Sequence, residues 1–90
     1  MEFEWDERKA RANVKKHGVS FHDAATVFGD PLAITFPDPD HSEEEERLVT
    51  FGVSQSQQLL VVAHTNRGVR TRIINARLMT RKEKVIYEEG

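Results

Sequence analysis

The spacing of apolar and charged positions near the N-terminus predicts two helices. Residues 7–16 are rich in charge and have apolar positions at helical spacing, with Asp6 placed to cap the helix and Gly18 placed to end it. Phe3 and Trp5 precede this helix, either as a packed entry strand or as a hydrophobic staple.

A second, shorter and more apolar helix is predicted over residues 21–28. Ser20 is its N-cap, and the Gly-Asp-Pro sequence at 29–31 ends it.

The rest of the chain predicts strands followed by a last helix. Four segments have the alternating or dense apolar pattern of strands: Leu32–Phe36, Arg47–Val53, Leu59–Thr65 and Arg70–Arg77. Short turns join the later segments, so these strands must run antiparallel. Thr80 and Glu83 then form the pattern of a capping box, and a helix follows towards Tyr87.

These elements predict an α+β fold with N-terminal helices, a four-stranded antiparallel sheet and a C-terminal helix. A chain of 90 residues has room for one core, so residues 1–90 are expected to form a single domain. Helices gathered before and after such a sheet should cover one face. The other face is then open to solvent, and we expect function there.

Composition excludes several classes of protein. The chain has no cysteine, which excludes disulfides and thiolate metal sites. It also has no apolar run long enough to cross a membrane, and its acidic N-terminal segment does not fit a signal peptide. These features fit a cytoplasmic protein without membrane contact.

The distribution of charge is more informative than the net charge of −2. The net value argues against a nucleic-acid ligand. However, the segment from His64 to Lys84 is rich in arginine, whereas residues 43–46 are four consecutive glutamates. Arginine matches phosphate geometry well, so this bias favours a nucleic-acid ligand over ordinary solvated charge. Salt bridges to the acidic loop are the alternative for some of these residues.

Three residues of the C-terminal half are candidates for catalysis. His64, at the end of the densest strand, is either a packed rim histidine or a proton-transfer group, because imidazole titrates near neutral pH. Arg72 and Arg77 are candidates for a phosphate clamp that stabilises the charge built up when RNA is cut. Arg77 would face away from Arg72 in a regular strand, but a break at Asn75 or Ala76 would re-aim it.

Other residues complete the predicted site. Glu46 and Arg47, at the start of a strand, are further catalytic candidates, and a carboxylate there could accept a proton or orient a histidine. The predicted RNA-binding residues are Lys16, His41, Arg67 and Arg70. The histidines lack the spacing of metal ligands, so neither a metal nor another cofactor is expected.

Short motifs follow one another along nearly the whole chain. They are Phe3-Glu4-Trp5-Asp6, Lys9, Asn13, Lys16-His17-Gly18-Val19 with Phe21, Val27-Phe28 with Asp30-Pro31, Asp40-His41-Ser42, Glu45-Glu46-Arg47, Gly52, Arg72-Ile73-Ile74 with Ala76-Arg77, Glu83 and Tyr87. In order and spacing they resemble the BrnT toxins of bacterial type II toxin–antitoxin modules. One position departs from that pattern, since Asn75 stands where serine is common; asparagine cannot give a hydroxyl proton, and we expect a modest effect.

The resemblance implies a RelE-like fold and a ribonuclease that blocks translation. It also implies a BrnA-type antitoxin of the ribbon-helix-helix kind, through which the complex binds operator DNA and represses its own operon, with the toxin as a homodimer in that complex. By position it points to His41, Glu45, Glu46, Arg47, Arg72 and Arg77, with Lys16 and His17 in addition.

We therefore expect a metal-independent endoribonuclease. The alternatives are a non-catalytic module that acts as co-repressor with a DNA-binding partner, and a structural domain with surface charge only.

Overall fold

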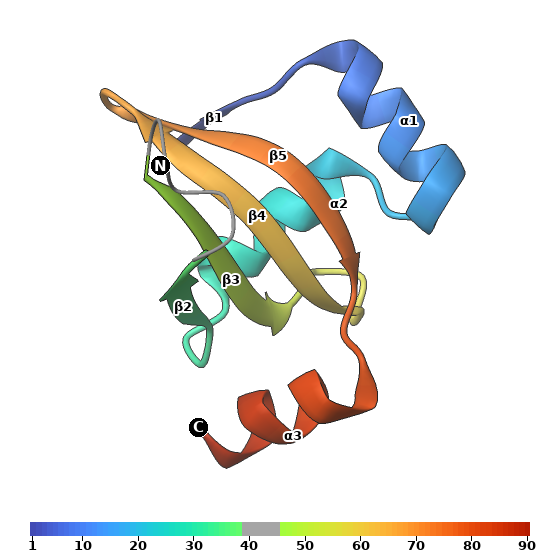
Figure 1. Cartoon of the computed structure of the whole chain (residues 1–90), viewed down its shortest axis with the longest axis vertical. Coiled ribbons are helices and arrows are strands. Elements are labelled where there is room, and N and C mark those ends of the chain that lie inside the picture. Colours follow the sequence, from blue (N-terminus) through green and yellow to red (C-terminus); the bar gives the residue numbers. More distant parts are fainter. Residues whose placement is uncertain (39–45) are drawn as a thin grey trace.

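The computed structural model describes residues 1–38 and 46–90 (Figure 1). The elements in chain order are β1 (Glu2–Glu4), α1 (Glu7–His17), α2 (Phe21–Ala25), the 3-10 turn η1 (Thr26–Gly29), β2 (Ile34–Pro37), β3 (Arg47–Val53), β4 (Leu59–Arg67), β5 (Arg70–Leu78) and α3 (Arg81–Glu89). The predicted α+β class is confirmed.

The strands form one mixed sheet of five strands in the order β1-β5-β4-β3-β2. Strands β2 to β5 pair antiparallel, as predicted. The prediction of four strands was wrong, because β1 adds a fifth that runs parallel to β5 and sets Glu4 beside Arg72. Phe3 therefore belongs to an entry strand. Three residues give too short a pattern to reveal a strand whose partner lies at the other end of the chain.

The predicted caps are confirmed by their hydrogen bonds, but the second helix, predicted over residues 21–28, is α-helical only over Phe21–Ala25 and continues as the 3-10 turn η1. The Asp6 carboxylate accepts from the backbone N–H groups of Arg8 and Lys9 at the start of α1, and Gly18 ends the helix in the left-handed conformation with φ of 71°. At α2 the Ser20 hydroxyl accepts from a backbone N–H in the same way. These local signals fix where the helices begin and end.

The main core lies between one face of the sheet and the second helix. Leu60, Val62, Ile73 and Ala76 of β4 and β5 are buried there against Phe21, Ala24 and Val27 of α2 and η1. Figure 1 shows α2 lying across this face, with α1 alongside β5.

The opposite face is not left open to solvent along its whole length, which corrects the prediction. Phe51, Val61 and Met79 form a second buried cluster there, and Tyr87 of α3 packs on it. The reason is that β5 leads into α3 through Met79, so α3 folds back over this second face and not over the face that α2 covers. Only the part of the second face that α3 leaves uncovered can contact solvent.

A register shift in β5 decides where its arginines point. His64 pairs with Ile73 but Ala63 pairs with Asn75, so Ile74 is an extra residue in the ladder. Arg72 stands opposite Thr65 and Arg77 opposite Val61, four residues apart on β4. Because side chains alternate along a strand, both arginines lie on one face. A break in the strand, which the sequence left open, thus re-aims Arg77, but the extra residue is Ile74 rather than Asn75 or Ala76.

Candidate functional site

A basic groove lies between α1 and β5, with a volume of about 340 Å³. The residues that line it are Lys9, Ala12, Asn13, Lys16, His17, Ile74, Asn75 and Arg77. Three of them are lysine or arginine and a fourth is a histidine, while none of the lining residues is an aspartate or glutamate. This groove is called the basic groove below.

Helical spacing places the α1 residues of the groove. Lys9 and Lys16 are seven residues apart, which is two turns, so they project from the same face of the helix. Asn13 lies between them and is buried. Its side-chain amide donates to the carbonyls of Val19 and Ala76 at 2.9 and 2.8 Å and accepts from the N–H of Ala76 at 3.1 Å. The Asn13 side chain thus makes the two backbone hydrogen bonds with Ala76 that a neighbouring strand would make, and it holds α1 beside β5.

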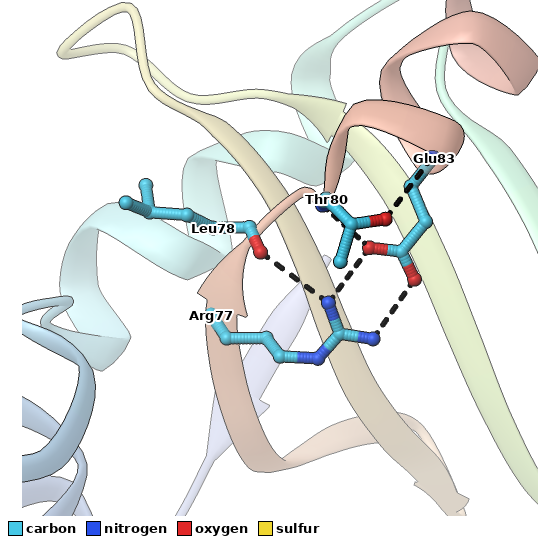
Figure 2. Close-up of polar contacts among 4 residues, drawn as sticks. All are labelled: Arg77, Leu78, Thr80 and Glu83. Atoms are coloured by element: carbon cyan, nitrogen blue, oxygen red, sulfur yellow. Dashed lines mark hydrogen bonds and ion pairs between the residues drawn. The ribbon is translucent and has the colours of Figure 1, made fainter.

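Arg77 lines the groove from β5 and is held by Glu83 of α3 (Figure 2). Arg77 Nη1 and Nη2 donate to the two carboxylate oxygens at 2.7 and 2.9 Å, and Nη1 also donates to the Leu78 carbonyl at 3.3 Å. The arginine hydrogen bond lowers the pKa of Glu83 to about 2, and the pKa of Arg77 is raised by the same bond. Both groups are therefore charged at every physiological pH.

Arg72 and Arg47 lie in one row across the sheet, apart from the groove. Thr65 of β4 pairs with Arg47 on one side and with Arg72 on the other. Arg72 donates to Glu4 at 2.7 Å, and Arg47 Nε lies 3.7 Å from the carboxylate of Asp38. Both arginines are thus paired with acids that do not belong to the glutamate run.

The remaining predicted residues spread over the same end of the sheet. Arg70 pairs with Glu2 and Glu4 at 3.5 and 3.9 Å and is half-exposed, and Arg67 lies in the exposed hairpin next to it. Glu46 is exposed, and its carbonyl accepts from the Thr65 hydroxyl at 2.6 Å. His41 lies outside the described residues.

His64 lies on the core face and is only 4% exposed. Its ring meets Phe28 edge-on with centroids 4.8 Å apart, and its Nε2 lies 2.7 Å from the Thr50 hydroxyl. Burial lowers its pKa to about 4, so the ring is neutral at pH 7. The geometry matches the packed histidine that the sequence left open as one interpretation.

Of the residues to which the sequence pointed, the structure brings three together in the basic groove: Lys16, His17 and Arg77. Sequence reasoning missed three features there: the lining by Lys9, the anchoring by Asn13 and the clamp by Glu83. The spacing of Lys9, Asn13 and Lys16 on one helix face was a signal that could have found the first two. Glu83 was explained by its capping box, so its second partner went unnoticed.

The part of the chain that the structure describes has neither a metal-binding cluster nor a helix that could span a membrane. Residues 1–38 and 46–90 contain no cluster of histidine, cysteine, aspartate or glutamate side chains able to hold a metal ion. None of their helices is long and apolar enough to cross a membrane.

Comparison with known proteins gives two positive findings. Residues 5–83 match the family described as "Ribonuclease toxin, BrnT, of type II toxin-antitoxin system". The crystal structure of the Brucella abortus ribonuclease toxin BrnT is similar, with a TM-score of 0.71 and 25% sequence identity over 90% of this chain and 99% of that one. No curated protein matches significantly in sequence. The fold thus resembles that of BrnT.

Proposed function

The chain belongs to the BrnT family of ribonuclease toxins of type II toxin–antitoxin systems, and on this premise we propose that it cleaves RNA in the basic groove. The single observation that carries this proposal is the groove itself. It gathers Lys9, Lys16 and Arg77 from two elements with no carboxylate among its lining residues. Such a surface attracts a phosphodiester backbone and orients it by the arginine fork.

The proposed reaction uses the 2′-hydroxyl of the substrate as nucleophile. O2′ attacks the adjacent phosphorus, the bond from phosphorus to O5′ breaks, and a 2′,3′-cyclic phosphate and a 5′-hydroxyl end result. Negative charge accumulates on the phosphoryl oxygens in the transition state, where Arg77 and Lys16 stabilise it. Since the substrate supplies the nucleophile and side chains supply the cations, we propose that no metal ion is needed.

We propose His17 as the group that accepts the proton of the 2′-hydroxyl. It is half-buried and lines the groove with Arg77. Water protonates the leaving O5′, and the resulting hydroxide takes the proton back from the imidazolium, so protons balance. His64 was the sequence candidate for this role, but a side chain only 4% exposed on the core face cannot touch RNA unless the core opens.

The arginines beyond the groove are proposed to bind the substrate on either side of the cleaved bond. Arg72 and Arg77 share a face of the sheet, and Arg47 lies in one row with Arg72. Arg70 and Arg67 continue the basic surface to the hairpin. An RNA strand that leaves the groove along this face would meet them in turn. Glu46, just before β3, remains a proposed contact, and so does His41, which lies outside the described residues.

As a type II toxin, the chain has an antitoxin partner. We propose that this is a BrnA-type protein with a ribbon-helix-helix part, and that the complex binds operator DNA through the antitoxin and represses its own operon. We further propose that residues 1–90 act as one toxin domain in the cytoplasm, that the toxin forms a homodimer within the complex, and that RNA cleavage inhibits translation.

Two neighbouring lysines of α1 allow a matched test. Lys16 lines the groove, whereas Lys15 does not. Purified wild-type protein should cut a defined single-stranded RNA in excess chelator. Lys16→Ala should slow the cut roughly tenfold or more, whereas Lys15→Ala should leave it within about twofold. Equal loss in both variants would remove the groove from the mechanism, and no cutting by the folded wild type would favour the co-repressor alternative.

A further inference from the structure

We infer that Glu83 is a positioning residue of the RNA site: it holds Arg77 so that one bidentate edge of the guanidinium stays free for a phosphate. This inference rests on the proposed function and adds a residue from α3 to a site built on α1 and β5. Glu83 itself is not among the residues that line the basic groove.

The hydrogen bonds of Arg77 show which edge is used and which is free (Figure 2). The Nη1–Nη2 edge faces Glu83 at 2.7 and 2.9 Å, and the other Nη1 hydrogen meets the Leu78 carbonyl. Nε and the second hydrogen of Nη2 have no acceptor among the described residues. Together they form the other bidentate edge, which matches two oxygens of a phosphate. Glu83 thus binds Arg77 and leaves two N–H donors of the guanidinium available for a phosphate.

Glu83 is itself held firmly. Its carboxylate accepts from the Thr80 backbone N–H at 2.8 Å while its own N–H donates to the Thr80 hydroxyl at 3.2 Å, which completes the capping box. The N-terminus of α3 favours a negative charge at this position. The helix is in turn fixed by buried Met79 and by the hydrogen bond from Tyr87 to Asp30. The arginine is therefore tied to a rigid element.

This arrangement reduces the conformational entropy that Arg77 would lose when it binds a phosphate. Arg77 is 39% exposed, and an unrestrained side chain of this kind loses rotamer freedom when it binds a phosphate. Glu83 restricts those rotamers before the substrate arrives, which favours a reactive geometry. Its negative charge also weakens phosphate attraction, so a blocking role is the opposing possibility. The two roles predict opposite changes of rate when Glu83 is neutralised.

The test compares substitutions on α3 in single-turnover cleavage of RNA. Glu83→Gln keeps the shape and loses the ionic fork, and we expect the rate at saturating enzyme to fall tenfold or more. Glu88→Gln, on the same helix but exposed, controls for the change in charge. Lys84→Gly, at an exposed position of α3, controls for helix stability, because it weakens the helix and leaves the fork and the capping box in place. Both controls should stay within about twofold of wild type.

A double-mutant cycle separates positioning from simple destabilisation. In an Arg77→Ala background, Glu83→Gln should change the rate less than twofold, because the group it positions is gone. A faster Glu83→Gln enzyme, an equal loss in Lys84→Gly, or a full Glu83→Gln effect without Arg77 would each overturn the inference.

A binding measurement keeps the two proposals distinguishable. If the wild type does not cut RNA, the proposed function fails. The affinity for a 2′-O-methyl RNA, which cannot be cut, then still measures how well Arg77 binds a phosphate. Weaker binding by Glu83→Gln than by Glu88→Gln would support positioning, whereas tighter or equal binding would overturn it.

Discussion

The imidazole of His64 and the hydroxyl of Thr50 share a hydrogen bond of 2.7 Å inside the core. The Thr50 hydroxyl is also hydrogen-bonded to the Thr35 hydroxyl at 2.8 Å, so His64 Nε2 lies at one end of a short chain of hydrogen bonds. Nδ1 is buried and has no partner among the described residues. A protonated ring would need acceptors for both nitrogens, and no carboxylate of residues 1–38 or 46–90 pairs with it, so the fold favours the neutral form.

Stability should therefore fall as the solution is made acidic. His64 titrates near 6.5 when unfolded and near 4 when folded, so between these values the unfolded chain binds the proton more tightly. The free energy of unfolding from urea titrations should drop by about 2–3 kcal/mol between pH 7.5 and 4.5. A His64→Gln protein should lack this part of the drop. A His64 NMR signal that titrates near 6.5 in the folded protein would contradict the interpretation.

Tyr87 is the only tyrosine of the chain, so its ionisation can be followed by absorbance alone. Its hydroxyl donates to Asp30 at 2.5 Å, and this bond, with burial and the nearby charge, raises its pKa to about 12. Phenolate should appear near pH 12 in folded protein and near pH 10 in denaturant. The contribution of this bond to stability is complete below pH 10 and is lost as pH rises through about 12. A folded-state transition near pH 10 would show that the bond does not form.

Asn13 should be among the most important single side chains for stability. Asn13→Ala leaves the buried N–H and carbonyl of Ala76 without these partners, and we expect a loss of about 2–4 kcal/mol in the free energy of unfolding. Asn66→Ala is the matched control, since Asn66 is exposed and should cost less than about 0.5 kcal/mol. Equal effects of the two substitutions would mean that α1 does not depend on this contact.

Gly52 is required by close packing rather than by backbone conformation. A Cβ atom there would lie 2.7 Å from Val27 Cγ1 and 3.2 Å from a carboxylate oxygen of Asp30. Gly52→Ala should cost about 1–3 kcal/mol, and adding Val27→Ala should relieve part of the clash in a double-mutant cycle. Gly29→Ala, where a Cβ meets nothing within 4 Å, serves as control in the same thermal or urea melts. No coupling between the Gly52 and Val27 substitutions would exclude the clash as the cause.

Local sequence was enough to predict the helices and most of the sheet. Asp6, Ser20 and Thr80 cap helices through hydrogen bonds to residues two or three positions away, so the signal and its consequence lie within one turn. The antiparallel pairing of β3, β4 and β5 could be predicted as well, because a short turn joins strands that are near neighbours in the sequence. Family membership could also be read from the order of motifs along the chain.

The tertiary structure alone decided which charged groups meet. Glu4 reaches Arg72 because β1 pairs with β5, and Lys16 reaches the neighbourhood of Arg77 because Asn13 docks α1 on the same strand. Such contacts depend on strand order and on a one-residue register shift, which no local pattern specifies. His64 shows the same limit, since its pattern fitted a rim position as well as a buried one.

The sequence by itself determined most of the elements and the N-caps of the helices, because capping, alternation and turn formation act between near neighbours. The structure decided that Arg77 is clamped by Glu83, that His64 is enclosed and that the basic groove lies between α1 and β5. These features arise from contacts between segments far apart in the chain, where packing of the whole core selects one arrangement among many that the same local patterns would allow.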